Sequence, residues 1–193
     1  KVYYTHMDKS IALFNIGTDD IELGMNILGA HIDSPRIDVK QNPQYEDSNL
    51  VFWDTHYYGG IKKYQWVAMP LAIHGVVVKK DGTIINLSIG DKENDPVFCI
   101  TDLLPHLGQE QMEKKATKVI EGEALDLLIA SQPVKGELKD GVTQFLNIIL
   151  EKEYNFTEQD LLSAELEIVP AGKARDMGFD RSMIMAYGQD DRV

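Results

Sequence analysis

The sequence predicts an α/β framework that is interrupted by a long β-rich block. Strand-like segments lie near both ends of the 193-residue chain, at residues 10–16, 25–32 and 183–187. The residues between about 34 and 172 instead alternate β-forming runs with turn signals. We therefore expect the two ends to belong to one domain, into which the β-rich block is inserted.

Two segments near the N-terminus have the composition of strands. Residues 10–16 are apolar, and residues 25–32 (MNILGAHI) predict a buried strand that ends before Pro35. Proline ends it because it cannot donate a hydrogen bond to a neighbouring strand. Residues 38–54 are polar and carry a turn signal at Pro43, so we expect them to be irregular.

The clearest local signal is a hairpin. Residues 72–79 and 83–89 are rich in β-formers, and Asp81-Gly82 lies between them. This dipeptide tolerates the positive φ angles that a tight hairpin turn requires. The run VFCIT at residues 97–101 predicts a further strand.

Helical periodicity is clearest at residues 142–154. Phe145, Ile148 and Ile149 recur there at the three- and four-residue spacing of an amphipathic helix. Residues 124–130 are apolar as well, but their pattern does not distinguish a strand from a helix.

A second, shorter helix is indicated just beyond the first. Thr157 followed by Asp160 is the pattern of a helix N-terminus, so we expect a short helix at residues 158–164. Residues 165–169 then predict a strand that ends at Pro170.

Composition excludes several classes of partner. The chain carries 31 acidic and 19 basic residues, a net charge of -12, which opposes binding to nucleic acid or to an anionic membrane surface. Cys99 is the single cysteine, so neither an intrachain disulfide nor a cysteine-rich zinc site can form. These features, with no apolar run of the roughly 18 residues that a membrane span needs, predict a cytoplasmic protein.

One group of candidate site residues follows the predicted strand at residues 25–32. On a strand, His31 and Asp33 project to the same face because they lie two positions apart. Neutral imidazole is a good zinc ligand, and a neighbouring carboxylate can orient the ring. The alternative is that His31 is a structural core histidine and that Asp33 belongs to a turn.

The second candidate is the acidic pair Asp190-Asp191, which follows the apolar segment 183–187. Two adjacent carboxylates repel each other unless a cation or a donor compensates them. A solvated acidic turn is the alternative. Taken together, a histidine and a distant carboxylate are the elements of a two-metal hydrolytic site, in which the carboxylate bridges the ions.

Three long segments of the chain resemble one family closely. They are GAHIDSPRIDVKQNPQYED (29–47), HYYGGIKKYQWVAMPLAIHGVVVKKDG (56–82) and YGQDDRV (187–193). On these segments the chain resembles the aspartyl aminopeptidase and aminopeptidase I family of dinuclear zinc metallopeptidases, and the resemblance extends over nearly the whole chain.

The resemblance implies roles for individual residues. His31 is expected to bind zinc, Asp33 to support the catalytic centre, and Asp190 to bridge two zinc ions, with cobalt or manganese as possible substitutes. His106 is expected to contact peptide substrate in a neighbouring subunit, and an unremarkable surface or interface histidine is the alternative.

The resemblance also implies a domain division and an assembly. Residues 1–33 and 173–193 would form part of an α/β catalytic domain. Residues 34–172 would form an inserted, barrel-like domain that pairs subunits and helps to build a homododecamer. The implied activity is removal of N-terminal residues, acidic ones in some members, from peptides.

Two departures from the family pattern limit this expectation. The family takes its general base and one zinc ligand from a Glu-Glu pair and a further ligand from a late histidine. This chain contains no Glu-Glu pair, and no histidine follows His106. We therefore expect the chain to be the N-terminal part of a longer enzyme and to be inactive alone. A non-catalytic oligomerisation module, or another two-zinc hydrolase such as a carboxypeptidase or deacylase, are the alternatives.

Overall fold

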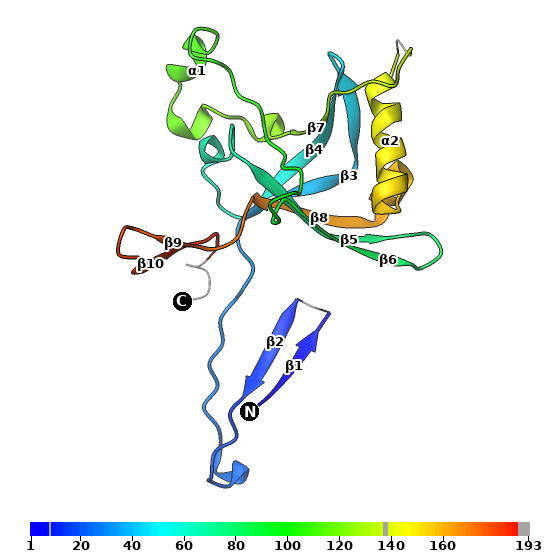
Figure 1. Cartoon of the computed structure of the whole chain (residues 1–193). Coiled ribbons are helices and arrows are strands. Elements are labelled where there is room, and N and C mark those ends of the chain that lie inside the picture. Colours follow the sequence, from blue (N-terminus) through cyan, green and yellow to red (C-terminus); the bar gives the residue numbers. More distant parts are fainter. Residues whose placement is uncertain (8, 137–138, 189–193) are drawn as a thin grey trace. The chain divides into compact units, whose positions relative to one another are not determined.

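The computed structural model describes residues 1–7, 9–136 and 139–188. Their contacts divide the chain into two compact units (Figure 1). The first contains Lys1–Ser34 and the chain from Gly188 onward, and the second contains Pro35–Tyr187.

The first unit is built on a hairpin. Strands β1 (Val2–His6) and β2 (Ser10–Phe14) pair antiparallel, which confirms the strand predicted at residues 10–16. A short 3-10 helix, η1 (Ile21–Leu23), follows, and the Asp20 side chain caps it by accepting a hydrogen bond from the backbone N–H of Glu22 at 3.0 Å.

The buried strand predicted at residues 25–32 is wrong. The segment has no strand structure, and its residues are exposed, with Leu28 at 97% of its full accessibility. Apolar composition alone cannot form a strand, because a strand requires a hydrogen-bonded neighbour and a layer that covers its apolar side chains. The described residues supply neither to this segment.

The second unit contains a curled six-stranded sheet (Figure 1). Its strand order is β6-β5-β8-β3-β4-β7, and the pairings between neighbouring strands are antiparallel. The strands are β3 (Arg36–Asp47), β4 (Leu50–Tyr58), β5 (Leu71–Val78), β6 (Ile84–Ile89), β7 (Leu127–Ala130) and β8 (Ala164–Pro170). The fold is therefore sheet-rich, and the predicted α/β framework is not seen among the described residues.

The irregular region predicted at residues 38–54 is also wrong, because it forms most of the β3–β4 hairpin. Val51, Trp53 and Thr55 alternate on β4 and are buried on one face of the sheet. Phe52 and Asp54 lie between them on the other face and are only partly buried, so the segment has the alternation of a half-buried strand. Ser48 and Asn49, with φ values of 53° and 59°, form the two-residue turn.

The hairpin predicted at residues 72–79 and 83–89 is confirmed by β5 and β6. Gly82 has a φ of 86°, and the Asp81 side chain accepts a hydrogen bond from the backbone N–H of Thr83 at 2.9 Å. Within β5, Gly75 has a φ of 139°, and a Cβ atom there would lie 1.9 Å from the carbonyl oxygen of Glu165. Strands β5 and β8 therefore approach too closely at this point for any side chain.

The segment between β6 and α2 has little regular structure. The run at residues 97–101 forms isolated bridges instead of the predicted strand, through Phe98 and Cys99. Short helical turns follow, and residues 127–130 of the ambiguous apolar run form β7. These turns are α1 (Gln109–Met112), η3 (Ala116–Lys118) and η4 (Gly122–Ala124). A further short turn, η2 (Lys63–Gln65), lies earlier in the chain, between β4 and β5.

The long predicted helix is confirmed as α2 (Gly141–Tyr154), which covers one face of the sheet (Figure 1). Its buried side chains are Val142, Leu146 and Leu150, and Ile148 is 41% exposed. The buried face is therefore rotated from the predicted one, because residues four apart at 142, 146 and 150 meet the sheet.

The last elements of the unit follow α2 directly. The predicted capping pattern of Thr157 and Asp160 is present and begins η5 (Glu158–Ser163), a 3-10 helix instead of the expected α-helix. Strand β8 then confirms the strand predicted at residues 165–169. A hairpin of β9 (Arg175–Met177) and β10 (Met183–Met185) ends the described part of the unit.

No helix among the described residues is long and apolar enough to cross a membrane.

Gly75 provides a test of the sheet geometry. Replacing Gly75 with Ala is expected to cost about 3 kcal/mol or more, since the new methyl group must displace the backbone of β8. Urea unfolding followed by circular dichroism measures the loss. Gly82→Ala is the matched control, because it shares the positive φ but has open space around it, and should cost about 1 kcal/mol. Equal losses in the two variants would contradict the close approach.

Candidate functional site

His31 and Asp33 lie together in the first unit. The Nδ1 atom of His31 is 3.2 Å from the Oδ1 atom of Asp33 and 3.1 Å from its carbonyl oxygen. A proton on Nδ1 would be held by these two acceptors. That tautomer leaves the lone pair of Nε2 as the one that can bind a metal ion.

The exposure of the His31 and Asp33 side chains is relevant to the alternative that His31 is a structural core histidine. The His31 side chain is 65% exposed, and that of Asp33 is 51% exposed. Among the described residues the imidazole of His31 is therefore not enclosed, and it is held by the neighbouring carboxylate.

The donors near His31 suit a zinc ion in kind. Imidazole nitrogen and carboxylate oxygen are common zinc ligands. The hydroxyl oxygen of Ser34, three residues further on, is buried, and the described residues offer it no hydrogen-bond partner. A buried polar atom of this kind is often satisfied by water or an ion. The local chemistry therefore fits a metal site, although the donors are too few to complete one.

The partner ligand predicted from the sequence lies outside the described residues. Asp190 and Asp191 both belong to the segment 189–193, of which the structure gives no description. Within the described ranges, no group of three or more histidine, cysteine, aspartate or glutamate side chains is arranged to hold a metal ion. The described part of the chain thus contains one predicted zinc ligand with its supporting acid.

His106 lies in the second unit, in an exposed turn before α1. The neighbouring leucines are exposed as well, Leu103 at 57%, Leu104 at 59% and Leu107 at 66%. A groove of about 220 Å³ lies beside this turn, lined by Pro105 among others. His106 does not line the groove, and three exposed leucines in five residues are typical of a surface that contacts another protein.

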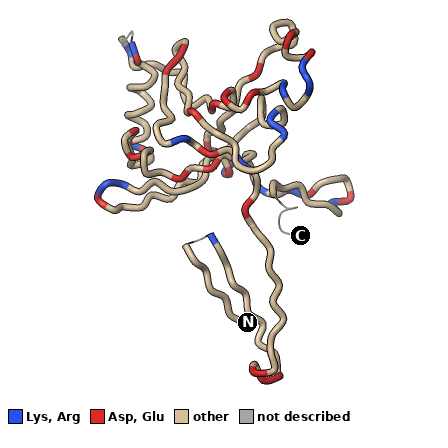
Figure 2. Tube along the Cα trace, turned by 180° about the vertical axis from the view of Figure 1, so that it is seen from behind, with Lys and Arg blue, Asp and Glu red and all other residues tan. Residues whose placement is uncertain are grey.

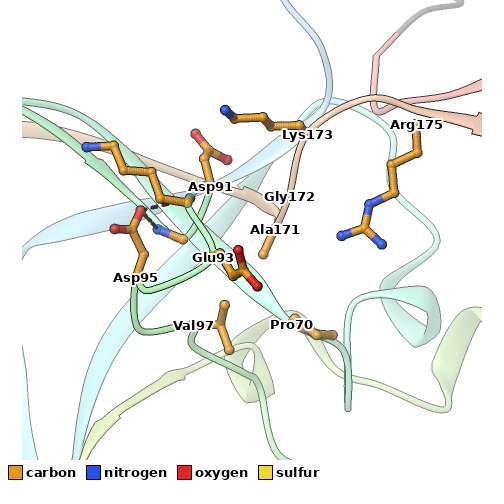
Figure 3. A pocket seen from close by; sticks show the side chains of 11 residues that line it. Pro70, Asp91, Glu93, Asp95, Val97, Ala171, Gly172, Lys173 and Arg175 are labelled. Atoms are coloured by element: carbon orange, nitrogen blue, oxygen red, sulfur yellow. Dashed lines mark hydrogen bonds between the residues drawn. The ribbon is translucent and has the colours of Figure 1, made fainter.

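A larger pocket of about 680 Å³ lies at the end of the sheet (Figure 3). Two of its three acidic residues have structural partners: Asp91 lies 3.2 Å from the His74 ring, and Asp95 accepts hydrogen bonds from the backbone of Gly90 and Lys92. None of the predicted site residues lines it, so we do not assign the chemistry here. The lining comprises Pro70, Gly90, Asp91, Lys92, Glu93, Asp95, Val97, Ala171, Gly172, Lys173 and Arg175.

A polar row across the sheet was not predicted from the sequence. Strand pairing places Ser88, His74, Glu167, Asp38 and His56 opposite one another on five successive strands. Directly opposed residues share one face of a sheet, so this row lies on the face opposite to the core. The sequence signal for this row is the alternation of buried and polar residues along each strand. The largely polar composition of residues 38–54 obscures that alternation.

Arg36 organises the centre of this polar face. Its Nε atom lies 2.8 Å from Asp38 and 3.2 Å from Glu167, and its guanidinium group stacks on the Tyr58 ring at 4.2 Å. Acidic and basic residues both occur throughout the second unit (Figure 2). Arg36 therefore fixes the start of β3, where the chain enters this unit.

A second polar cluster links β3 to the start of β7. The Tyr45 hydroxyl donates a hydrogen bond to Asp126 at 2.5 Å, and Lys40 lies 2.8 Å from Asp54. Burial raises the pKa of Asp126, and the nearby charge of Asp54 raises it further, while the hydrogen bond from Tyr45 opposes the shift. Burial and the bond to Asp126 also raise the pKa of the Tyr45 hydroxyl.

A histidine whose ring is oriented by a carboxylate is a common feature of metal sites in enzymes. The family model for aminopeptidase I zinc metalloproteases, M18, matches residues 1–193, and the chain belongs to this family.

Individual relatives agree closely with this assignment. An M18 family aminopeptidase 1 of Clostridium acetobutylicum is 61% identical over 100% of this chain and 42% of its own length. The crystal structure of the M18 aminopeptidase of Thermotoga maritima matches with a TM-score of 0.90 at 50% identity, covering 98% of this chain and 42% of that one. The structure of aminopeptidase I from C. acetobutylicum gives a TM-score of 0.88. The chain thus spans less than half the length of these relatives.

The raised pKa of Asp126 predicts a pH effect on stability. The folded state holds this proton more tightly than the unfolded chain, so the carboxyl costs stability as the pH rises from its usual pKa of 3.8 through the raised value. Asp126→Asn removes that cost. We expect the variant to lose less stability than the wild type between about pH 4 and pH 7, as measured by urea unfolding.

Asp47→Asn is the control for this comparison, since Asp47 lies on the same strand as Tyr45 and is exposed. It should follow the wild-type pH dependence. An Asp126→Asn curve that runs parallel to the wild-type curve would contradict the assignment.

Proposed function

We propose that this chain forms part of a zinc-dependent aminopeptidase, which removes N-terminal residues from peptides. The observation that carries the proposal is the His31–Asp33 pair, an accessible imidazole whose Nδ1 is held 3.2 Å from a carboxylate oxygen. Membership of the M18 zinc metalloprotease family supports both the metal and the reaction.

In the proposed site each residue has a distinct role. His31 would hold a zinc ion through Nε2, and Asp33 holds the ring in the required tautomer and orientation. Asp190 would supply a carboxylate ligand. When bound, the zinc ions would polarise the peptide carbonyl and lower the pKa of a water molecule. The general base expected from the family resemblance, a glutamate of a Glu-Glu pair, does not occur in this sequence.

The finer parts of the proposal concern the architecture and the assembly. Residues 34–172 act as an inserted domain that pairs subunits, and the residues on either side belong to the catalytic domain. The subunits form a homo-oligomer, a dodecamer by family resemblance. The exposed leucines around His106 support this, because such side chains are usually covered by another protein surface.

The proposal also includes the class of substrate, the metal and the cellular location. Peptides with a free N-terminus are the substrates, with an acidic first residue as one option. Zinc is the expected metal at two positions, and cobalt or manganese can replace it because the same nitrogen and oxygen donors bind them. We place the protein in the cytoplasm, and propose no nucleic-acid or membrane partner.

A non-catalytic oligomerisation module is the alternative function. It would use the same exposed surface around His106 but would need no metal. An oligomerisation module does not require a carboxylate that orients His31. The family assignment does not favour this alternative.

Replacing His31 tests the proposal directly. In the intact protein that contains this chain, His31→Ala should lower zinc content and reduce release of N-terminal residues by at least about 100-fold, since a metal ligand is lost. The wild type should cleave unblocked peptides and leave N-acetylated ones intact. His56→Ala is the matched control, an exposed histidine outside the proposed site.

Full zinc content and activity in His31→Ala would contradict the assignment of the ligand. The 193-residue chain alone should bind zinc weakly and show no turnover. Efficient hydrolysis by this chain alone would contradict the proposed need for additional residues.

His106 has a separate test. If it contacts the substrate in a neighbouring subunit, His106→Ala should raise KM about tenfold, the loss of one hydrogen bond to a charged group, with zinc content unchanged. Steady-state kinetics and metal analysis give the two values. A variant with unchanged KM, or one that loses zinc, would contradict the proposed role.

A further inference from the structure

The second unit begins at Pro35 and ends at Tyr187. These two residues lie beside each other. The Tyr187 hydroxyl donates a hydrogen bond to the carbonyl oxygen of Pro35. These residues are 152 positions apart in the sequence, so this contact joins two otherwise distant points of the backbone.

The Tyr187 ring is itself fixed against the core of the second unit. It packs edge-on against Trp66, with ring centroids 5.6 Å apart and an interplanar angle of 85°. Trp66 is only 5% exposed and belongs to the hydrophobic core. Edge-to-face pairs of this kind are favourable because the ring edge meets the electron-rich face.

The Pro35 side of the contact is fixed as well. A Cβ atom on Gly59 would lie 3.4 Å from the Cβ of Pro35, so the two residues are in ordinary van der Waals contact. The next residue, Arg36, is held by two carboxylates and by the Tyr58 ring. Both ends of the Tyr187–Pro35 hydrogen bond are therefore attached to rigid parts of the same unit.

The proposed metal ligands lie within a few residues of this contact. His31 precedes Pro35 by four residues, and Asp190 follows Tyr187 by three. An extended chain covers at most about 3.6 Å per residue, so the two ligands can lie no further than about 14 Å and about 11 Å from their attachment points. The hydrogen bond holds Pro35 and Tyr187 together. It therefore limits how far apart His31 and Asp190 can lie.

We infer that Tyr187 is a positioning residue for the zinc site: its hydrogen bond to Pro35 holds together the two chain segments that carry His31 and Asp190. This inference rests on the proposed function, because it assigns those two residues to one metal site. Tyr187 acts through the backbone and touches neither metal nor substrate.

Tyr187→Phe in the intact protein tests the inference, because it keeps the ring on Trp66 and removes only the hydroxyl. Competition with a chromophoric chelator measures zinc affinity, and hydrogen exchange measures protection of the backbone at residues 34–36 and 186–188. We expect zinc to bind about three- to tenfold more weakly, less than the 10- to 100-fold typical of direct partners of a ligand. Exchange in both segments should become faster.

Tyr45→Phe is the matched control, since it removes another tyrosine hydrogen bond in the same unit, the one to Asp126. It should lower stability but leave zinc affinity unchanged. If both variants weaken zinc equally, the effect of Tyr187→Phe is general destabilisation and the inference is overturned.

His31→Ala separates this inference from the proposed function. If His31→Ala abolishes zinc binding while Tyr187→Phe leaves it intact, the function stands and the positioning role is overturned. If His31→Ala leaves zinc binding intact, the proposed function fails and the positioning role fails with it, whatever hydrogen exchange shows. Weaker zinc binding with faster exchange in Tyr187→Phe alone supports the role.

Discussion

One row of isoleucines holds the second unit together. Strand pairing places Ile37, Ile168, Ile73 and Ile89 opposite one another on β3, β8, β5 and β6. The first three are at most 2% exposed. Because side chains alternate along each strand, the register that buries this row also places the polar row from Ser88 to His56 on the opposite face. A slip of one residue would exchange the two faces.

The same register determines where the chain enters and leaves this unit. Burial of Ile37 fixes the start of β3, and Arg36 beside it is held by its carboxylate partners. Tyr187, at the other end of the unit, rests on the buried Trp66. The two ends of the second unit are therefore both held by packing within that unit.

Sequence reasoning succeeded where structure is decided locally. The Asp81-Gly82 turn, the helix α2 and the capping pair of Thr157 and Asp160 all depend on residues close in the chain. It failed at residues 25–32 and 38–54, where apolar or polar composition misled and pairing with distant strands decides. In the site, His31 and Asp33 are in contact, although the strand on which this contact was predicted does not form. The contact of Tyr187 with Pro35 spans 152 positions and had no local signal.

The central claim is that His31 binds zinc together with Asp190. A crystal structure of the intact protein, with data collected on both sides of the zinc absorption edge, tests it most directly. We predict an anomalous peak about 2.0–2.1 Å from Nε2 of His31 and about 2.0–2.2 Å from a carboxylate oxygen of Asp190. A zinc ion bound elsewhere, with His31 facing solvent, would contradict the account.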